Sequence, residues 1–288
     1  MHSMHQDGGV TSTPKTRRTD PAATNNETST PDAPGSHQSV ERALMALDLL
    51  AVGPMRVGEL AEALGLVQST TSRLMLTLER AGYVARTARS GAFELGPMVL
   101  KLGGSAANQN RVHRASRVLA QHLAHEYGVG VNVASRAGKQ LQYLVSLQGG
   151  AQVVPVTLLG QFSPLHATAL GKSLLLGVPE RQREELVTPM TRYTAKTLTT
   201  FEALDEELAQ AFLDGFTHEI EELALGRACF AAPVRDESGD IVAAVSVSGS
   251  VRAMDPTQRR GEWGAIVVEI ADAISTNLGF LGQRGTVE

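Results

Sequence analysis

The residues best suited to chemistry in this sequence form a short polar run near the start of a predicted helix. Amide, hydroxyl and guanidinium groups follow one another closely in Gln68, Ser69, Thr70, Thr71 and Arg73. At the start of the second helix of a helix-turn-helix, short polar side chains can approach base edges in the major groove and read their donors and acceptors. The run therefore predicts DNA recognition. A three-helix protein-interaction module with a solvated polar face is the alternative interpretation.

The charge around this run favours the DNA interpretation. The whole chain is acidic, with a formal net charge of -4 and a pI near 6.1. Residues 68–91 nevertheless contain four arginines and a single carboxylate, and Arg89 lies at the tip of a predicted hairpin. We expect a local basic patch that contacts DNA phosphates. The overall charge argues against a protein that binds polyanions over its whole surface.

Three helices and a hairpin are predicted to position these groups. Hydrophobic periodicity, with glycine and proline as breakers, predicts helices over residues 39–52, 56–65 and 68–81. Two short strands, 83–87 and 92–95, complete the pattern of a winged helix-turn-helix. The apolar stripe of the first helix is expected to comprise Val40, Ala43, Leu44, Leu47, Leu50 and Ala51. The third helix is expected to turn Leu74, Leu78 and Ala81 inward.

A second set of candidate groups lies at the start of a later predicted helix. Gly171-Lys172-Ser173 resembles the end of a phosphate-binding loop, but the first glycine of that motif would fall at His166, so a nucleotide site is not predicted. Free backbone N–H groups around residues 168–171, together with the helix dipole, suit a small carboxylate. Ordinary capping of a surface helix is the alternative explanation.

Other candidates for catalysis or metal binding are weak. His122 and His125 lie one turn apart on a predicted helix, but no third ligand accompanies them. Cys229, the single cysteine, has no neighbouring histidine and lies in an apolar strand, which favours an inert buried thiol or a pocket wall. No Ser-His-Asp set or carboxylate pair can be assembled. We therefore predict no catalytic residue, no cofactor and no metal.

The composition sets the broad class of the protein. A chain of 288 residues with 42% hydrophobic residues is long enough for about two domains of ~100–200 residues. One cysteine fits a reducing compartment, and no apolar run is long enough to span a bilayer, so a cytoplasmic protein without membrane contact is expected. Residues 1–38 are rich in Thr and Pro and poor in large apolar side chains, which predicts a disordered tail.

Helices and strands follow one another through the second half of the chain, which predicts an α+β domain. Amphipathic patterns predict helices over residues 98–110, 111–127, a segment after 168, 201–215 and 256–278. Alternating patterns predict a hairpin across Ala137-Gly138 and further strands over residues 151–159, 216–222, 227–235 and 241–248.

Three segments in this order resemble the IclR family of bacterial transcriptional regulators. They are GLVQSTTSRLMLTLERAGYVARTARSGAFELG, PLHATALGKSLLL and EELALGRACFAAPVRDESGDIVAAVSVSG. The resemblance covers about residues 39–280. Two departures are the Gln68 position, which is often basic in relatives, and the longer N-terminal tail.

The resemblance implies a domain order and a state of assembly. A winged helix-turn-helix would span residues 39–97 and a linker helix 98–110. A GAF-like α/β effector-binding domain with an antiparallel sheet would span 111–282, and a tail 283–288. Members of the family assemble as homodimers or homotetramers.

The resemblance also implies a site for the carboxylate of a small organic acid. Backbone amides of Ala169 and Leu170 would bind the acid, and Phe162 and Leu165 would form apolar walls. Arg227 stands where relatives commonly have an apolar residue, and it could anchor a second carboxylate or pair with a nearby glutamate. The remaining matched positions are Glu219, Cys229, Ser246 and Ser248.

The predicted function is a ligand-responsive, DNA-binding transcriptional regulator. It would bind a palindromic double-stranded operator as a dimer and respond to a small carboxylate. The alternative is an α/β enzyme that metabolises a small acid and carries the winged helix as an accessory interaction module. The absence of a recognisable acid-base pair or activated nucleophile disfavours that alternative.

Overall fold

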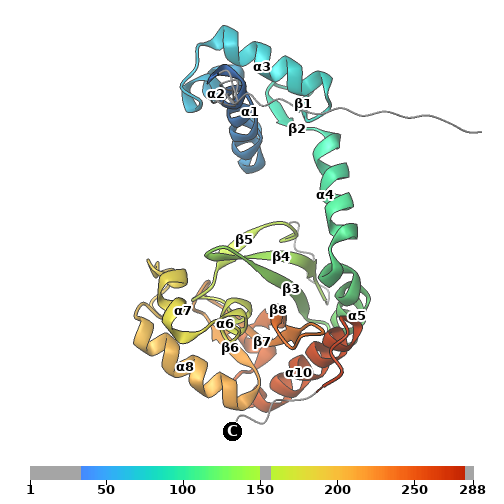
Figure 1. Cartoon of the computed structure of the whole chain (residues 1–288), viewed down its shortest axis with the longest axis vertical. Helices are drawn as coiled ribbons and strands as arrows, with labels where there is room; N and C mark the ends of the chain where they lie inside the picture. The colour runs from blue at the N-terminus through green and yellow to red at the C-terminus, as the bar shows by residue number, and fades with distance from the viewer. Residues whose placement is uncertain (1–33, 150–156, 283–288) are drawn as a thin grey trace, which may run out of the picture.

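A long helix joins a small N-terminal domain to a larger C-terminal domain (Figure 1). The computed structural model describes residues 34–149 and 157–282. Most of the predicted tail, residues 1–33, and the predicted C-terminal tail, residues 283–288, lie outside this part of the chain. The first helix begins at Pro34, before the expected start at Ser39.

The N-terminal domain has the predicted winged helix-turn-helix architecture. Its elements in chain order are α1 (Pro34–Val52), α2 (Val57–Ala63), α3 (Gln68–Arg80), β1 (Val84–Arg86) and β2 (Phe93–Leu95). The two strands pair antiparallel and form the wing. One hydrophobic cluster holds helices and wing together through Ala46, Leu50, Leu60, Leu64, Met75, Val84 and Phe93.

The core-facing sides of α1 and α3 agree with the prediction only in part. The leucines expected to face inward pack against the hydrophobic cluster at Leu47, Leu50, Leu74 and Leu78, but other positions differ. On α1, Ala46 and Leu50 are buried, whereas Val40 and Leu44 are more than half exposed. On α3 the buried residues are Thr71 and Met75, and Ala81 is exposed. The helical period explains both corrections, because residues four apart share one face. The stripe that meets the core passes through 46 and 50 on α1 and through 71 and 75 on α3.

Helix α4 (Pro97–Gln109) connects the two domains and buries none of its residues. Leu100 is 81% exposed and Leu102 is also exposed. Asn110 ends this helix and begins α5 (Arg111–Tyr127), because its side chain accepts a hydrogen bond from the His113 amide. The linker α4 is therefore a separate helix, and its Leu100 and Leu102 are exposed to solvent in a single copy of the chain.

The C-terminal domain is built on a six-stranded antiparallel sheet of order β5-β4-β3-β8-β7-β6. The strands are β3 (Gly130–Ala137), β4 (Gln140–Leu147), β5 (Phe162–Pro164), β6 (Thr217–Ile220), β7 (Arg227–Arg235) and β8 (Ile241–Ser250). The strand expected over 151–159 falls mostly outside the described residues, and 157–159 are not strand. β5 pairs with β4, and its three residues are too few to produce an alternating pattern.

Helices cover both faces of this sheet (Figure 1). α5 and α10 (Arg260–Asn277) pack on one face, around Trp263 and Phe230. The other face carries α6 (Ala169–Leu175), α7 (Glu180–Val187) and α8 (Phe201–Asp214), while α9 (Val251–Met254) follows β8 directly. Among the described residues, no helix has the length and apolarity needed to span a membrane.

The alternation of the strands places the polar residues on the α6 face. Val131 and Val133 of β3 and Val245 and Val247 of β8 belong to the core under α5 and α10. Side chains of successive residues point to opposite faces of a sheet. Asn132 and Ser246, which are cross-strand partners, therefore face α6.

Candidate functional site

The exposed face of α3 carries four of the five predicted DNA-reading residues. Gln68, Ser69, Thr70 and Arg73 are exposed. Thr71 is 0% exposed, and its hydroxyl donates to the carbonyl of Val67 at 3.3 Å. Thr71 therefore belongs to the core of the domain, and its prediction as a DNA-binding residue is wrong.

The wing adds positive charge beside α3. Arg86 pairs with Glu79 of α3 at 3.2 Å and lies over the ring of Phe93 at 4.3 Å, so it joins wing and helix. Arg89 is exposed at the wing tip. Among the described residues no carboxylate pairs with Arg73 or Arg89. These two guanidinium groups are thus available to phosphates.

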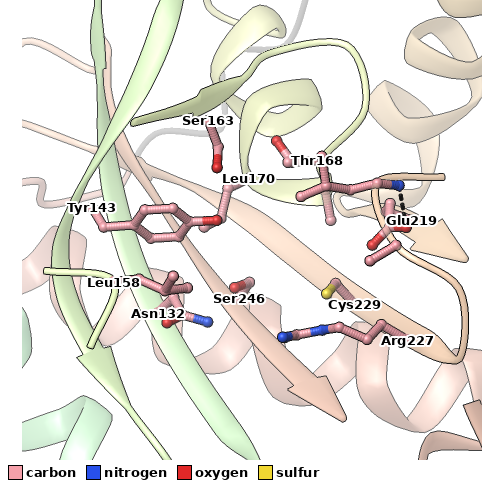
Figure 2. A pocket seen from close by; sticks show the side chains of 13 residues that line it. Asn132, Tyr143, Leu158, Ser163, Thr168, Leu170, Glu219, Arg227, Cys229 and Ser246 are labelled. Carbon is pink, nitrogen blue, oxygen red and sulfur yellow. Dashed lines mark hydrogen bonds between the residues drawn. The ribbon is translucent and has the colours of Figure 1, made fainter. Parts of the chain in front are cut away.

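A cavity of about 150 Å³ lies in the C-terminal domain, between the sheet and the loop that leads into α6 (Figure 2). It is lined by Asn132, Tyr143, Leu158, Ser163, Thr168, Ala169, Leu170, Glu219, Leu223, Ala224, Arg227, Cys229 and Ser246. Each of the six strands of the sheet contributes at least one lining residue. The loop after β6 and the start of α6 close it from above.

Six of the nine predicted effector-binding residues line this cavity. They are Ala169, Leu170, Glu219, Arg227, Cys229 and Ser246.

Phe162, Leu165 and Ser248 do not line the cavity. Phe162 is 52% exposed because the alternation of β5 turns Ser163 inward instead. Leu165 packs into the core beneath α6. The Ser248 hydroxyl accepts a hydrogen bond from Nη2 of Arg227 at 3.2 Å and lies 3.4 Å from the carbonyl of Gly130, to which it donates. Ser248 therefore contacts Arg227, which lines the cavity, and does not line the cavity itself.

The cavity also has lining residues that the sequence analysis missed. Asn132 interrupts a strand of buried valines, and a polar residue inside such a run was a usable signal. Tyr143 and Ser163 give no comparable signal, because each comes from a different part of the chain, whereas Thr168 belongs to the helix start that the sequence analysis had already selected. Leu158, Leu223 and Ala224 are the other members.

Asn132, which lines the cavity, carries a buried acceptor without a partner. Its side chain is only 4% exposed, and Oδ1 has no hydrogen-bond partner among the described residues. A buried polar atom without a partner costs about 1–3 kcal/mol relative to a bonded one.

Two further groups set the electrostatics of the cavity. Burial raises the pKa of Glu219, and hydrogen bonds from the backbone amides of Leu223 and Glu222 to Oε1 act against that rise. Burial raises the pKa of the Cys229 thiol to about 12. The thiol therefore stays protonated at neutral pH and is a poor nucleophile.

Lys172, from the sequence that resembled a phosphate-binding loop, has a structural role. It is 0% exposed, and its Nζ donates to Glu222 at 2.6 Å, to Glu207 at 2.8 Å and to the carbonyl of His218 at 3.2 Å. Its charge is already balanced by two carboxylates and cannot serve a phosphate. Among the residues described, no cluster of three or more His, Cys, Asp or Glu could hold a metal ion.

The sequence matches known families over both domains. The IclR helix-turn-helix domain matches residues 39–88, and the bacterial transcriptional regulator IclR C-terminal domain matches residues 104–276. The transcriptional repressor IclR of Escherichia coli (strain K12) is 30% identical over 261 residues, covering 88% of this chain and 94% of that protein. The HTH-type transcriptional repressor AllR of Klebsiella pneumoniae is 30% identical over 257 residues, covering 88% and 94%.

Solved structures share the fold. The IclR protein of Thermotoga maritima superposes with a TM-score of 0.70 at 26% identity and covers 85% of this chain and 100% of that chain. An IclR homologue of Microbacterium hydrocarbonoxydans complexed with 4-hydroxybenzoate has a TM-score of 0.72 at 22% identity, covering 84% and 98%.

Both domains of this chain thus match proteins that regulate transcription, which sets aside the alternative of an enzyme with an accessory winged helix. The chain belongs to the IclR family of bacterial transcriptional regulators.

Proposed function

We propose that this regulator is a cytoplasmic dimer that binds a palindromic operator and that a small organic acid in the C-terminal cavity changes its affinity for that operator. The observation that carries the proposal is that one chain combines an exposed polar recognition helix with a cavity of about 150 Å³ in its C-terminal domain.

The DNA contacts are proposed to come from α3 and the wing. Gln68, Ser69, Thr70 and Arg73 would face base edges, and Arg89 would reach the backbone beside them. A winged helix presents its recognition helix to the major groove, where amide, hydroxyl and guanidinium groups discriminate base pairs. Because the chain as a whole carries a net negative charge, we expect DNA to contact only the face formed by α3 and the wing.

Dimer formation is supported by apolar side chains that the single chain leaves exposed near the DNA-binding domain. Val40, Leu44 and Met45 of α1 and Leu100 and Leu102 of α4 are all exposed. Burying such side chains against a second copy would stabilise a dimer by about 25 cal/mol per Å² of apolar surface. A two-fold dimer would present two recognition helices to two related half-sites.

The proposed effector site is the cavity. Polar side chains converge there on a space that leucine, alanine and tyrosine side chains also line, an arrangement that suits a small molecule. The bound 4-hydroxybenzoate in the homologue from Microbacterium hydrocarbonoxydans is a small acid of this kind. An effector can shift the spacing of the recognition helices only through a difference in its affinity for the two arrangements.

A mobility-shift titration against the DNA upstream of the protein's own gene tests the proposal. We expect a complex whose affinity falls steeply with salt and changes when one member of a panel of small carboxylic acids is added. A complex that no acid affects would remove the effector half of the proposal. Failure to bind at low salt would remove the DNA half.

A further inference from the structure

A single buried lysine lies among three carboxylates beside the cavity. Nζ of Lys172 in α6 lies 2.6 Å from Oε1 of Glu222 and 2.8 Å from Oε1 of Glu207 in α8. The third carboxylate is that of Glu219 in β6, which lies in the cavity wall (Figure 2) and accepts a hydrogen bond from the Glu222 amide at 2.6 Å. Lys172, Glu219 and Glu222 are all buried. The cluster thus brings more acidic than basic groups into a region with little access to water.

The histidine beside this cluster does not supply a second positive charge at neutral pH. Nδ1 of His218 lies 4.0 Å from Oε1 of Glu207, but burial lowers the pKa of the His218 ring. Lys172 is therefore the cation that faces the three carboxylates. Burial and the charges of Glu207 and Glu219 raise the pKa of Glu222 to about 7, although Lys172 acts in the opposite direction.

The Glu222 side chain is only half satisfied as an anion. Its Oε1 accepts a hydrogen bond from Lys172, whereas its Oε2 is buried and has no hydrogen-bond partner among the described residues. A buried anionic oxygen without a donor is unfavourable, and protonation of the carboxyl removes the negative charge. Exposure to water would solvate the anion instead.

Glu222 belongs to a loop that borders the mouth of the cavity. We call residues 221–226, between β6 and β7, the rim loop. Leu223 and Ala224 of this loop line the cavity. Of the lining residues, Ala224 and Arg227 are exposed, so the cavity meets solvent beside the rim loop. A movement of the rim loop would therefore change access to the cavity.

The contacts of Glu222 hold the rim loop closed against backbone strain. The Glu222 carbonyl accepts a hydrogen bond from the Thr197 hydroxyl at 2.6 Å, and the amides of Glu222 and Leu223 both donate to Glu219. Glu221 has a φ of 60°, a left-handed conformation that is unfavourable for a residue with a side chain. Opening the loop would release this strain, so the closed loop depends on the state of the residue that follows Glu221.

We propose that a proton on Glu222 keeps the rim loop closed over the mouth of the cavity, and that loss of this proton favours an open loop. Glu207 and Glu219 repel the Glu222 anion in the closed loop, and Lys172 offsets only part of this repulsion. Because the closed loop binds the proton more tightly than the open loop, closure is favoured as pH falls. The inference rests on the proposed effector site and adds control of its access by pH. An effector would be retained more firmly under mildly acidic conditions.

Amide hydrogen exchange of the full-length protein tests the proposal without DNA or effector. The reporters are the amides of Glu222 and Leu223, which donate to Glu219 in the closed loop. After correction for the intrinsic effect of pH on exchange, their protection should fall about tenfold between pH 6 and pH 8. This is the change expected for a carboxyl with a pKa of about 7 in the closed loop and 4.5 in the open one. About 1 M urea should leave this protection unchanged, because local opening exposes little surface.

Two variants assign the pH dependence to one carboxyl. Glu222→Gln imitates the protonated side chain and should keep the reporter amides as well protected at pH 8 as at pH 6. Asp205→Asn is the matched control, since Asp205 of α8 pairs with Arg183 of α7 at 2.7 Å in the same domain and outside the cluster. This control should retain the tenfold change of the wild-type protein.

Three results would overturn the proposal. The first is protection in the wild-type protein that is the same at pH 6 and pH 8, and the second is a tenfold change that persists in Glu222→Gln. The third is exchange of the reporter amides only together with those of β8, which would mean that the domain unfolds as a whole and that the rim loop does not open separately. None of these results depends on operator or effector binding, which the mobility-shift titration measures, so failure of this inference and failure of the proposed function are distinguishable.

Discussion

On α3, two neighbouring side chains point in different directions, one to solvent and the next to the core. Thr70 and Thr71 are adjacent and chemically identical, yet Thr70 is exposed and Thr71 is buried with its hydroxyl on the Val67 carbonyl. The sequence identified the polar run but not the rotation of the helix within it. That rotation is set by Met75, which fills the core one turn later.

This difference gives a prediction for operator binding. Thr70→Val and Arg73→Ala should each weaken binding, Arg73→Ala by more than about tenfold, because they remove groups that we propose to face DNA. Thr71→Val should leave operator affinity unchanged and alter only stability, by about 1 kcal/mol, through loss of its hydrogen bond. Mobility shifts and thermal melts on the three variants separate the effects. Equal loss of DNA affinity in Thr70→Val and Thr71→Val would contradict the orientation of α3.

Glu222 is expected to make the stability of the C-terminal domain depend on pH. Burial raises its pKa from 4.5 to about 7, although Lys172 favours its charged form. Between these two values the folded state binds a proton more tightly than the unfolded state, so stability falls as pH rises through this window. Buried Glu219 contributes in the same direction, whereas His218, whose pKa is lowered by burial, contributes in the opposite one.

We therefore expect Glu222→Gln to flatten the decline in stability between pH 5 and pH 7, an effect on the order of 2 kcal/mol. Glu221→Gln is the control, because the side chain of Lys196 lowers the pKa of Glu221 and that residue should not produce the decline. Urea unfolding at a series of pH values measures the difference. An unchanged slope in Glu222→Gln would rule out this carboxyl as its source.

At the scale of elements, the local pattern predicted most helices and strands but not the cavity. Amphipathic helices such as α3, α5 and α8 repeat their pattern over several turns, and the long strands β7 and β8 are bounded by turn residues. β5 has only three residues and carries no period. The cavity joins side chains from all six strands of the sheet, from the start of α6 and from loops, so its composition depends on sheet order and register, which no local pattern encodes.

Two glycines in helices of equal length should respond in opposite ways to alanine. A Cβ at Gly171 of α6 would overlap the backbone of Leu165, so Gly171→Ala should destabilise the domain by about 1–3 kcal/mol. Gly58 of α2 has open space around it, and Gly58→Ala should stabilise by about 0.5–1 kcal/mol. Chemical unfolding checks both. A neutral Gly171→Ala would mean that α6 can move away from its loop without cost.

At the scale of the whole molecule, the proposed dimer depends on α1 and α4. The double variant Leu44→Glu and Leu100→Glu places charges on both exposed apolar surfaces and should convert dimer to monomer in sedimentation experiments. Operator affinity should fall by more than tenfold, since a monomer reads one half-site. Leu213→Glu, on the exposed end of α8, is the control and should leave a dimer. A dimer that survives the double variant would move the interface elsewhere.

The single cysteine of the chain lines the cavity, so the rate at which its thiol is labelled can report whether a ligand occupies the cavity. Cys229 is the only thiol in 288 residues, so any mass added by a thiol reagent reports one position. Its raised pKa makes labelling slow, and the reagent must enter the same space as an effector. The rate at which the intact protein gains one label, followed by mass spectrometry, therefore measures how much of the population is empty. An effector could be found by the delay that it causes, without knowledge of the operator.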